Sequence, residues 1–430
     1  MGISRRKWLG ANLLGAAAAG TLGALELEAR PQGAVSKPLP KAFDALKPLG
    51  DRVHPITAEE FAARREHARA LMAAAEPGFD ALYVTSGSGL YYFTGFRWGL
   101  SERLMAFVLP RKGEPLFVCP AFEGDRLREL AKPPAEIRTW EEDEDPYALV
   151  VRGLADRGVR TGRIAIEERV PFFFYDGLRR AGAGFEFASA NPVTIGCRAQ
   201  KSAAELELMR AACSATVDCY RAVFASIEEG MTEREVNGLI RGGFGKMGLE
   251  GGALVLFGRW AAQPHGTTTP QKLREGDVVL IDGGTSVEGY ASDVTRMTVM
   301  GTPAEKHRRA FEAVHRAQEA ALDAARAGRL SGTVDDAARG VITGAGYPGG
   351  YKVFTHRLGH GIGLDGHEHP YLVRGSRTVL APGMTFSNEP GIYLSGEFGL
   401  RLEDDMAITA DGPAQLLTPA LQPSLEKPCG

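Results

Sequence analysis

Two hydrophobic patterns alternate along the chain between about residue 56 and residue 198. Short apolar runs predict buried strands, and amphipathic segments between them predict helices. The expected strands lie at 81–85, 104–109, 115–118 and 163–167, and the expected helices at 57–75, 122–131 and 147–157. The first helix begins at Thr57, and Glu60 follows with the spacing of a capping box. The alternation predicts an α/β domain over residues 56–198.

The pattern changes in the second half of the chain, where the predicted helices are longer. They lie at 203–228, 232–247, 304–327 and 334–343, and a strand is expected at 255–260. Two further segments, 277–299 and 383–409, each show an apolar run, a glycine-rich turn and a returning strand. The order is therefore helices, hairpin, helices, hairpin. This order predicts an α+β domain over residues 199–425 with an approximate internal repeat.

Each predicted hairpin carries two acidic residues. Asp282 follows the apolar run at 278–281, and Asp293 stands at the start of the returning strand, so both side chains can share one face. Glu389 and Glu403 take corresponding places in the second hairpin. Four carboxylates brought together without a cation would repel one another, and an unpaired charge beside a buried strand is costly. The hairpins therefore predict a site for a pair of divalent metal ions.

The stretch 355–370 supplies histidines to this site. It holds four of the nine histidines of the chain, His356, His360, His367 and His369, among several glycines. Because glycine weakens a helix and no Glu follows His356, the stretch is not a helical HExxH zinc motif, and it lacks the GxGxxG spacing of a phosphate loop. Four carboxylates and one imidazole suit Mn, Co, Fe or Zn. Two such ions about 3.5–4 Å apart lower the pKa of a water that they share.

These motifs, in this order, resemble those of the pita-bread metallopeptidases, in the branch that contains aminopeptidase P, prolidase and creatinase. The resemblance covers about residues 55–430 and implies a creatinase-like N-terminal domain before a pita-bread catalytic domain with a pseudo-twofold repeat. It implies metal ligation by Asp282, Asp293, His360 in GHGIGL, Glu389 in NEPGIY and Glu403 in GLRLED. It also implies substrate or transition-state contacts by His265, His356, His367 and Arg401.

The resemblance further implies the reaction, which is hydrolysis of the Xaa-Pro bond at the N-terminus of a short peptide. Two divalent ions, Mn foremost, would serve it, with Glu389 as general base and His367 stabilising the oxyanion. A dipeptidase needs a cation for the substrate carboxylate, and Arg374 or Arg377 is a candidate that also reads as a solvated loop arginine. The sequence leaves dipeptidase and aminopeptidase open. A creatinase-type hydrolase of a non-peptide C–N bond and a non-catalytic peptide-binding protein are alternatives that the complete ligand set disfavours.

The N-terminal residues predict export. Residues 1–29 hold Ser4-Arg5-Arg6-Lys7, a twin-arginine pattern, before a charge-free stretch at 9–25. That stretch is shorter than the span of about 20 residues that a membrane anchor, the alternative, requires. We expect a periplasmic protein, or one otherwise exported by the twin-arginine route, with membrane contact only during export. Residues 30–55 are rich in proline and predict a linker.

Composition narrows the remaining possibilities. The net charge of −3 argues against a dedicated nucleic-acid binder, which is usually basic. The five cysteines are scattered and form no CxxC pair, so buried free thiols are expected in place of a disulfide framework. The resemblance implies a homodimer or a higher homo-oligomer.

Overall fold

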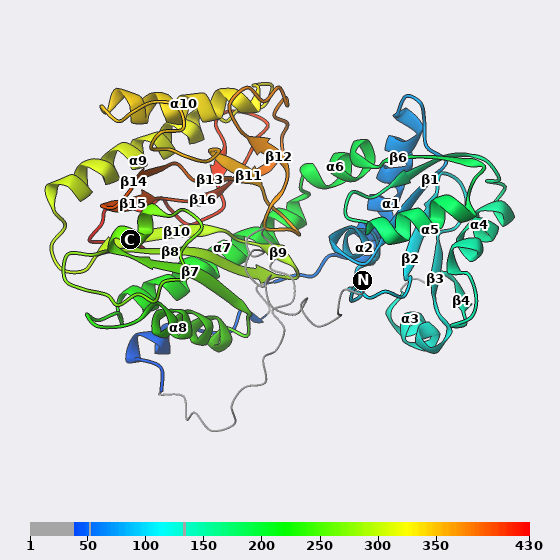
Figure 1. The fold of residues 1–430 in the computed structure, drawn as a ribbon, viewed down its shortest axis with the longest axis horizontal. Helices are drawn as coiled ribbons and strands as arrows, with labels where there is room; N and C mark the ends of the chain where they lie inside the picture. The colour runs from blue at the N-terminus through cyan, green and yellow to red at the C-terminus, as the bar shows by residue number, and fades with distance from the viewer. Residues whose placement is uncertain (1–37, 51–52, 132–134) are drawn as a thin grey trace, which may run out of the picture. The chain divides into compact units, whose positions relative to one another are not determined.

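The computed structural model describes residues 38–50, 53–131 and 135–430. The export signal predicted at 1–29 and the first residues of the predicted linker lie outside the described residues. The fold class predicted from the sequence is confirmed, since an α/β domain is followed by an α+β domain (Figure 1).

The N-terminal domain is built on a six-stranded sheet with the order β4-β3-β2-β1-β5-β6. Its central strand β1 pairs antiparallel with β2 and parallel with β5, and both of its faces are buried. Leu82 and Val84 enter one apolar cluster while Ala81 and Tyr83 enter another, because successive side chains of a strand point to opposite faces. The strands are β1 Ala81–Thr85, β2 Ala106–Pro110, β3 Leu116–Pro120, β4 Glu136–Trp140, β5 Gly162–Ile166 and β6 Phe185–Ser189.

Among the residues that the structure describes, the α-helices around this sheet are α1 Ala58–Ala74, α2 Ser88–Thr94, α3 Gly124–Leu130, α4 Pro146–Asp156, α5 Phe172–Ala181 and α6 Asn191–Ala199. The Thr57 hydroxyl accepts a hydrogen bond from the Glu60 N–H at the start of α1, as its spacing predicts. The sequence prediction misses β4 and β6. Both strands are mostly exposed or half-buried, so neither shows the continuous apolar run that marks the central strands.

The first sheet of the C-terminal domain has the order β10-β8-β7, and β9 adds to β8. Its elements are α7 Ala203–Phe224, α8 Glu233–Lys246, β7 Gly251–Phe257, β8 Val278–Val287, β9 Tyr290–Ala291 and β10 Val294–Val299. Val279 and Ile281 of β8 pack with α7 and α8, whereas Val278 and Leu280 belong to the cluster that also contains residues of α9. The strand is thus buried on both faces.

The second sheet has the order β12-β11-β13-β16-β17, and β14 and β15 form a separate pair. Its elements are α9 Glu305–Ala324, α10 Ser331–Gly344, β11 Gly359–Gly361, β12 Glu368–Leu372, β13 Thr385–Asn388, β14 Gly391–Leu394, β15 Phe398–Arg401, β16 Asp404–Ala407 and β17 Gln415–Leu416. Figure 1 shows α9 and α10 on one side of the sheets and α8 on the other. An isolated bridge between Thr295 and Glu403 joins the two sheets.

The structure corrects several predicted boundaries. Asp282 does not end its strand, because β8 continues to Val287. The returning strand predicted within 383–409 is divided between β15 and β16, which belong to different sheets, and Glu403 lies between them. The strand predicted at 255–260 ends at Phe257, and the 3-10 helix η4, Gly258–Ala262, follows.

The predicted linker also contains a packed segment. The 3-10 helix η1, Lys41–Ala45, buries Phe43 completely in the cluster around α7 and α8, so the prediction of a plain linker is wrong there. All five cysteines are free and four of them are buried, which agrees with the expectation of buried thiols. Within the described ranges, no helix combines the length and the apolar character needed to cross a membrane.

Candidate metal centre

The bridge between the sheets brings carboxylates from the two hairpins together. Thr295 is the cross-strand partner of Asp282 and exchanges backbone hydrogen bonds of 3.2 and 3.3 Å with Glu403. Its hydroxyl oxygen lies 2.7 Å from Asp282 Oδ1 and 2.8 Å from Glu403 Oε2. One hydroxyl therefore contacts both carboxylates. Asp293 also lies close to this pair, since one oxygen from each of the three carboxylates falls within 4.8 Å of the others.

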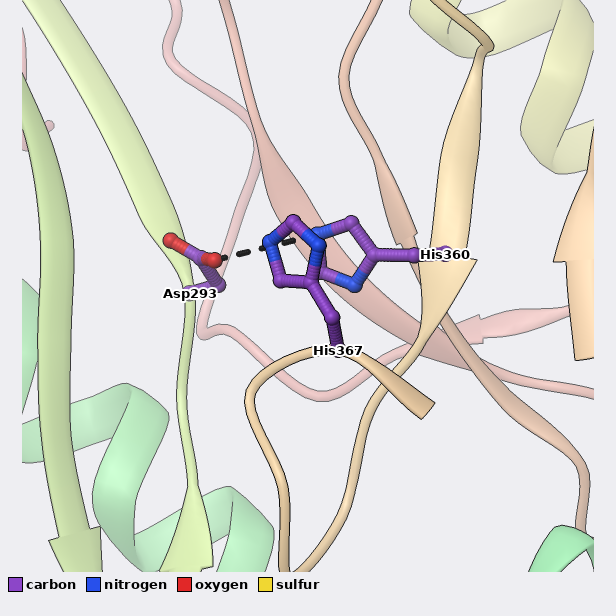
Figure 2. A group of neighbouring side chains, drawn as sticks. All are labelled: Asp293, His360 and His367. Carbon is purple, nitrogen blue, oxygen red and sulfur yellow. Dashed lines mark ion pairs between the residues drawn. The ribbon is translucent and has the colours of Figure 1, made fainter. Parts of the chain in front are cut away.

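His360 on β11 joins this cluster from the second sheet. Its Nε2 lies 3.5 Å from Glu389 Oε1 and 3.8 Å from Asp293 Oδ2. Figure 2 shows the imidazole of His360 directed at Asp293, with the His367 ring beside it. The Ser387 hydroxyl accepts the backbone N–H of His360 at 3.0 Å and donates to Glu389 Oε1 at 3.2 Å, so it fixes both residues. The five residues predicted as ligands thus converge on one place.

The cluster carries more negative charge than its neighbours neutralise. Burial, followed by the nearby carboxylates, raises the pKa of Asp293 and of Glu403 well above their usual ranges. Burial also raises the pKa of Glu389 to about 8. Asp282 differs: burial opposes its ionisation, but the Arg401 guanidinium that contacts it lowers its pKa below the ordinary value. Carboxylates forced together without enough cations form a cluster that divalent ions would relieve.

The donor set also fits divalent ions chemically. Four carboxylates with one imidazole are ligands for Mn, Fe, Co or Zn. Burial lowers the pKa of His360 to about 3, so its ring is neutral and its Nε2 lone pair is available. His367 stacks on His360 with ring centroids 3.6 Å apart and an interplanar angle of 16°, and one of its nitrogens falls in a group with Asp293 and His360. His367 therefore lies beside the candidate ligands.

Arg401 and His356 meet through a tyrosine that the sequence reasoning missed. Arg401 Nη1 donates to the Tyr393 hydroxyl oxygen at 2.7 Å, and that oxygen lies 2.7 Å from His356 Nε2. His356 Nδ1 lies 2.7 Å from the carbonyl oxygen of Arg357, so the proton of the neutral ring sits on Nδ1, and Nε2 accepts from Tyr393. Burial lowers the pKa of His356 to about 3. Tyr393 could have been found from its place in the NEPGIY motif, four residues after Glu389.

Two further histidines named by the sequence lie at the edge of the site. His265 is exposed and follows Pro264, whose carbonyl oxygen accepts hydrogen bonds from Arg401 at 3.4 Å. His369 is exposed on β12, with its ring 4.7 Å from the Tyr371 ring. His265 therefore takes its position from the same arginine that contacts Asp282, whereas His369 lies outside the groups of candidate ligands.

Comparison with known protein families decides the family of this chain. Residues 207–410 match the model of metallopeptidase family M24, and residues 64–200 match the creatinase/prolidase N-terminal domain. An Xaa-Pro dipeptidase of Lactobacillus delbrueckii subsp. lactis is 34% identical over 343 residues, which cover 78% of this chain and 92% of that protein. The chain belongs to metallopeptidase family M24.

Solved structures of M24 relatives share its fold. Dipeptidase PepE from Mycobacterium ulcerans superposes with a TM-score of 0.79 at 35% identity, covering 85% of this chain and 98% of that one. A recombinant prolidase from Thermococcus sibiricus gives a TM-score of 0.76 at 31% identity, with 85% and 98% covered. The M24 chain is therefore a metallopeptidase with a creatinase-like N-terminal domain.

The structure disfavours the arginines that the sequence offered for a substrate carboxylate. Arg374 pairs with Asp336 of α10 at 3.8 Å, and the two side chains are 60% and 57% exposed. Arg377 is also exposed. Arg374 is thus a solvated loop arginine that pairs with Asp336, which is the alternative that the sequence analysis gave for this residue.

A second charge cluster, buried except for Arg169 and missed by the sequence reasoning, holds the loop that carries His367. We call it the junction cluster; it consists of Arg169, Arg198, Lys201, Asp365 and Glu368. Lys201 Nζ donates to Glu368 at 2.6 Å, and Arg198 donates to both Asp365 and Glu368 at 2.5 Å. Arg169 donates to Asp365 at 2.8 Å and to the His367 carbonyl oxygen at 3.3 Å. These contacts fix the residues on both sides of His367.

Proposed function

We propose that this M24 protein is a dinuclear-metal peptidase that cleaves the Xaa-Pro bond at the N-terminus of short peptides. The observation that carries the proposal is the convergence of Asp282, Asp293, His360, Glu389 and Glu403 from two sheets on one place with unneutralised negative charge. The names of the relatives support the substrate class, since they include an Xaa-Pro dipeptidase and a prolidase.

The protein residues divide the work around this cluster. Two divalent ions held by the five ligands would supply Lewis acidity at the scissile carbonyl and a lowered pKa for the attacking water. Glu389, oriented by Ser387, is placed to take the proton of that water. His367 is exposed and stacks on the ring of His360, where it is placed to donate a hydrogen bond to the oxyanion. Arg401 and His356 are held by Tyr393 and orient the substrate.

The first test is hydrolysis of Ala-Pro, Ala-Pro-Ala and Ala-Ala by metal-stripped protein with and without added Mn. We expect Mn-dependent release of alanine from the proline peptides and much slower cleavage of Ala-Ala. The Asp282→Ala variant should be inactive. Glu397→Gln, which changes an exposed carboxylate in the second hairpin, should behave as the wild type. Protein that binds two metal ions per chain and cleaves neither proline peptide would sink the proposal and favour a creatinase-type hydrolase of a non-peptide bond.

The metal is proposed to be Mn. Oxygen-rich sites with one imidazole accept Mn, Co, Fe and Zn, so availability in the cell decides between them. Elemental analysis of protein purified without added metal, followed by reconstitution with each ion, tests this choice. The Mn-reconstituted enzyme should have the highest kcat/KM. A higher kcat/KM with Zn would contradict the choice of Mn and favour Zn.

We also propose that the protein is exported by the twin-arginine route, on the basis of Ser4-Arg5-Arg6-Lys7. A fusion of residues 1–37 to a reporter that folds in the cytoplasm should reach the periplasm. Replacing Arg5 and Arg6 together by lysine should abolish transport. Transport that persists in this variant would contradict the route.

A homo-oligomer is proposed from the family resemblance, and light scattering of the purified protein measures its mass.

A further inference from the structure

The candidate ligand Asp293 lies in a break between two strands. Its carboxylate points toward His360 (Figure 2). Residues 292 and 293 separate β9 from β10, whereas Asp282 stands inside β8 and is held by strand pairing on both sides. Metal ligands must be held within about 0.5 Å of their productive geometry. Asp293 therefore needs contacts other than strand pairing to fix its place.

Asp405 of β16 supplies one such contact. Its side chain is fully buried, and its Oδ2 accepts the backbone N–H of Asp293 at 3.0 Å. Asp405 is also the direct cross-strand partner of Ser387, the residue that fixes His360 and Glu389. Residues directly opposite in an antiparallel pair point to the same face of the sheet. The Asp405 carboxylate therefore lies on the face that carries the candidate ligands.

The helix α7 holds both residues of the break from the other side. The Cys213 thiol donates to the same Oδ2 of Asp405 at 3.3 Å, and the Thr216 hydroxyl lies 2.8 Å from the Ser292 hydroxyl. Cys213 and Thr216 are three residues apart, so they lie on one face of the helix. The helix thus contacts Ser292 directly and reaches Asp293 through Asp405.

The preceding residue, Asp404, shows what a structural carboxylate looks like in the same strand. It pairs with Arg296 at 2.5 Å and accepts a hydrogen bond from the Thr418 hydroxyl at 2.6 Å. Asp405 has no cation as a partner within the described residues, and its side-chain contacts are the Asp293 N–H and the Cys213 thiol. A buried carboxylate without a cation is costly, so its contact with a metal ligand calls for a functional reason.

We propose that Asp405, held by Cys213, is a positioning residue that sets the place of Asp293 and thereby the affinity of the centre for divalent ions. This inference rests on the dinuclear-metal centre of the proposed function and deepens it. A hydrogen bond from an N–H group to a carboxylate is about twice as strong as one between neutral groups. Asp405 therefore confines the backbone at Asp293 more tightly than an uncharged side chain would.

The test is the affinity of metal-stripped protein for Mn, measured by competition with a metal chelator. Asp405→Leu keeps the branched shape of the side chain and removes its acceptor oxygens, so the dissociation constant should rise about 10- to 100-fold. Asp405→Asn keeps an oxygen that accepts the Asp293 N–H and should stay closer to the wild type. Folded Asp405→Leu protein that binds Mn as tightly as the wild type overturns the proposal.

Cys213 provides a second test, which holds even when Asp405→Leu does not fold. Cys213→Ser keeps a donor and should keep the wild-type affinity for Mn, whereas Cys213→Ala removes the donor and should weaken binding. The matched control is Cys219→Ala, because Cys219 is a buried cysteine of the same helix whose thiol contacts the Ile240 carbonyl oxygen. Equal affinities of Cys213→Ala and Cys219→Ala for Mn overturn the proposal.

The spectrum of bound Co separates positioning from a general loss of stability. The visible absorption of Co²⁺ depends on the geometry of its ligands. The spectrum should change in Asp405→Leu and Cys213→Ala and should stay the same in Cys219→Ala. Variants that melt at a lower temperature but keep the wild-type spectrum and affinity would show a structural role alone, which overturns the proposal.

These measurements need no peptide hydrolysis, so this inference and the proposed function can fail separately. Weaker Mn binding in Asp405→Leu supports the positioning role even when the wild type cleaves no proline peptide and the peptidase proposal falls. Unchanged Mn binding in Asp405→Leu overturns the positioning role even when the wild type cleaves Ala-Pro.

Discussion

The protein contains two largely buried charge clusters, the junction cluster and the candidate metal centre, and the pKa values of their carboxylates shift in opposite directions. In the junction cluster, each carboxylate has a cation: Glu368 contacts Lys201 and Arg198, and these cations bring its pKa below the usual value although burial opposes this. In the metal centre, carboxylates crowd one another, and burial with mutual repulsion raises the pKa of Asp293 and Glu403.

The difference shows how a structural cluster can be told from a binding site. Both clusters are buried, both join segments distant in sequence, and both are densely hydrogen-bonded. The junction cluster is neutralised by its own cations, so it holds the chain together. The metal centre has Arg401 contacting one carboxylate, Asp282, and leaves the others to be compensated by bound cations. Because the uncompensated charge at the metal centre is negative, the ligands that this site favours are cations.

Removing a carboxylate from the metal centre should have the largest effect on activity. Glu403→Gln keeps the shape and takes away one ligand charge, so hydrolysis of Ala-Pro should fall about a thousandfold or more, since bound metal contributes several kcal/mol to catalysis. Added Mn should raise the melting temperature of the wild type but not of the variant. Without metal, the variant should be at least as stable as the wild type, because one like charge is gone. A large loss of stability in the metal-free variant would contradict this interpretation.

Removing a carboxylate from the junction cluster should lower the stability of the fold. Glu368→Gln leaves buried Lys201 without its carboxylate, so the free energy of unfolding should fall by about 3–5 kcal/mol. Urea denaturation measures this change, and Mn binding at 10 °C should be retained. The control is Glu186→Gln, which breaks an exposed pair with Arg163 and should cost about 0–1 kcal/mol. Similar losses in both variants would mean that the buried cluster is no stronger than a surface pair.

Glu167 sharpens the comparison because it is a buried carboxylate that forms no ion pair within the described residues. It is 4% exposed, and its hydrogen bond of 2.9 Å comes from the Arg169 backbone N–H. Burial, followed by the neighbouring Glu168, raises its pKa from 4.5 to about 7. Between these two pH values the folded chain keeps a proton that the unfolded chain has lost. The stabilisation from this protonated group is therefore complete below pH 4.5 and is lost as the pH rises through about 7.

Glu167→Gln mimics the protonated form at every pH. At pH 8 the variant should be more stable than the wild type by up to about 3 kcal/mol, and at pH 4.5 or below the difference should be close to zero. Urea denaturation of both proteins across this range checks the sign. A gain in stability that does not change with pH would show that the pKa of Glu167 is not raised.

The smallest effect is expected at the hydroxyl shared by two metal-centre carboxylates. Thr295→Val removes the contacts to Asp282 and Glu403 without changing the size of the side chain much. Loss of a group that orients metal ligands typically lowers metal affinity about 10- to 100-fold. Competition with a metal chelator measures this change. Thr298→Val on the same strand, whose hydroxyl bonds the Leu425 carbonyl oxygen, is the control and should keep wild-type affinity.

The order of elements could be predicted from the sequence because local patterns carry it. The capping residues Thr57 and Thr232 mark helix starts, and the apolar run at 81–85 marks the central strand, because caps and buried strands depend on neighbours in the chain. The exposed strands β4 and β6 escaped prediction, since their stability comes from pairing with distant strands. The same reason hides the division between β15 and β16.

The residue types at the metal centre were likewise fixed by the sequence, since each candidate ligand lies in a recognisable motif on a hairpin or in the histidine loop. Only the tertiary structure placed Thr295 between two carboxylates and Tyr393 between Arg401 and His356. The sequence offered Arg374 for the substrate carboxylate, whereas the structure pairs that residue with Asp336. Local motifs record which chemistry is available. Which charges meet depends on contacts between segments far apart in the chain, such as Asp282 and Arg401, which are 119 residues apart, and no local pattern encodes them.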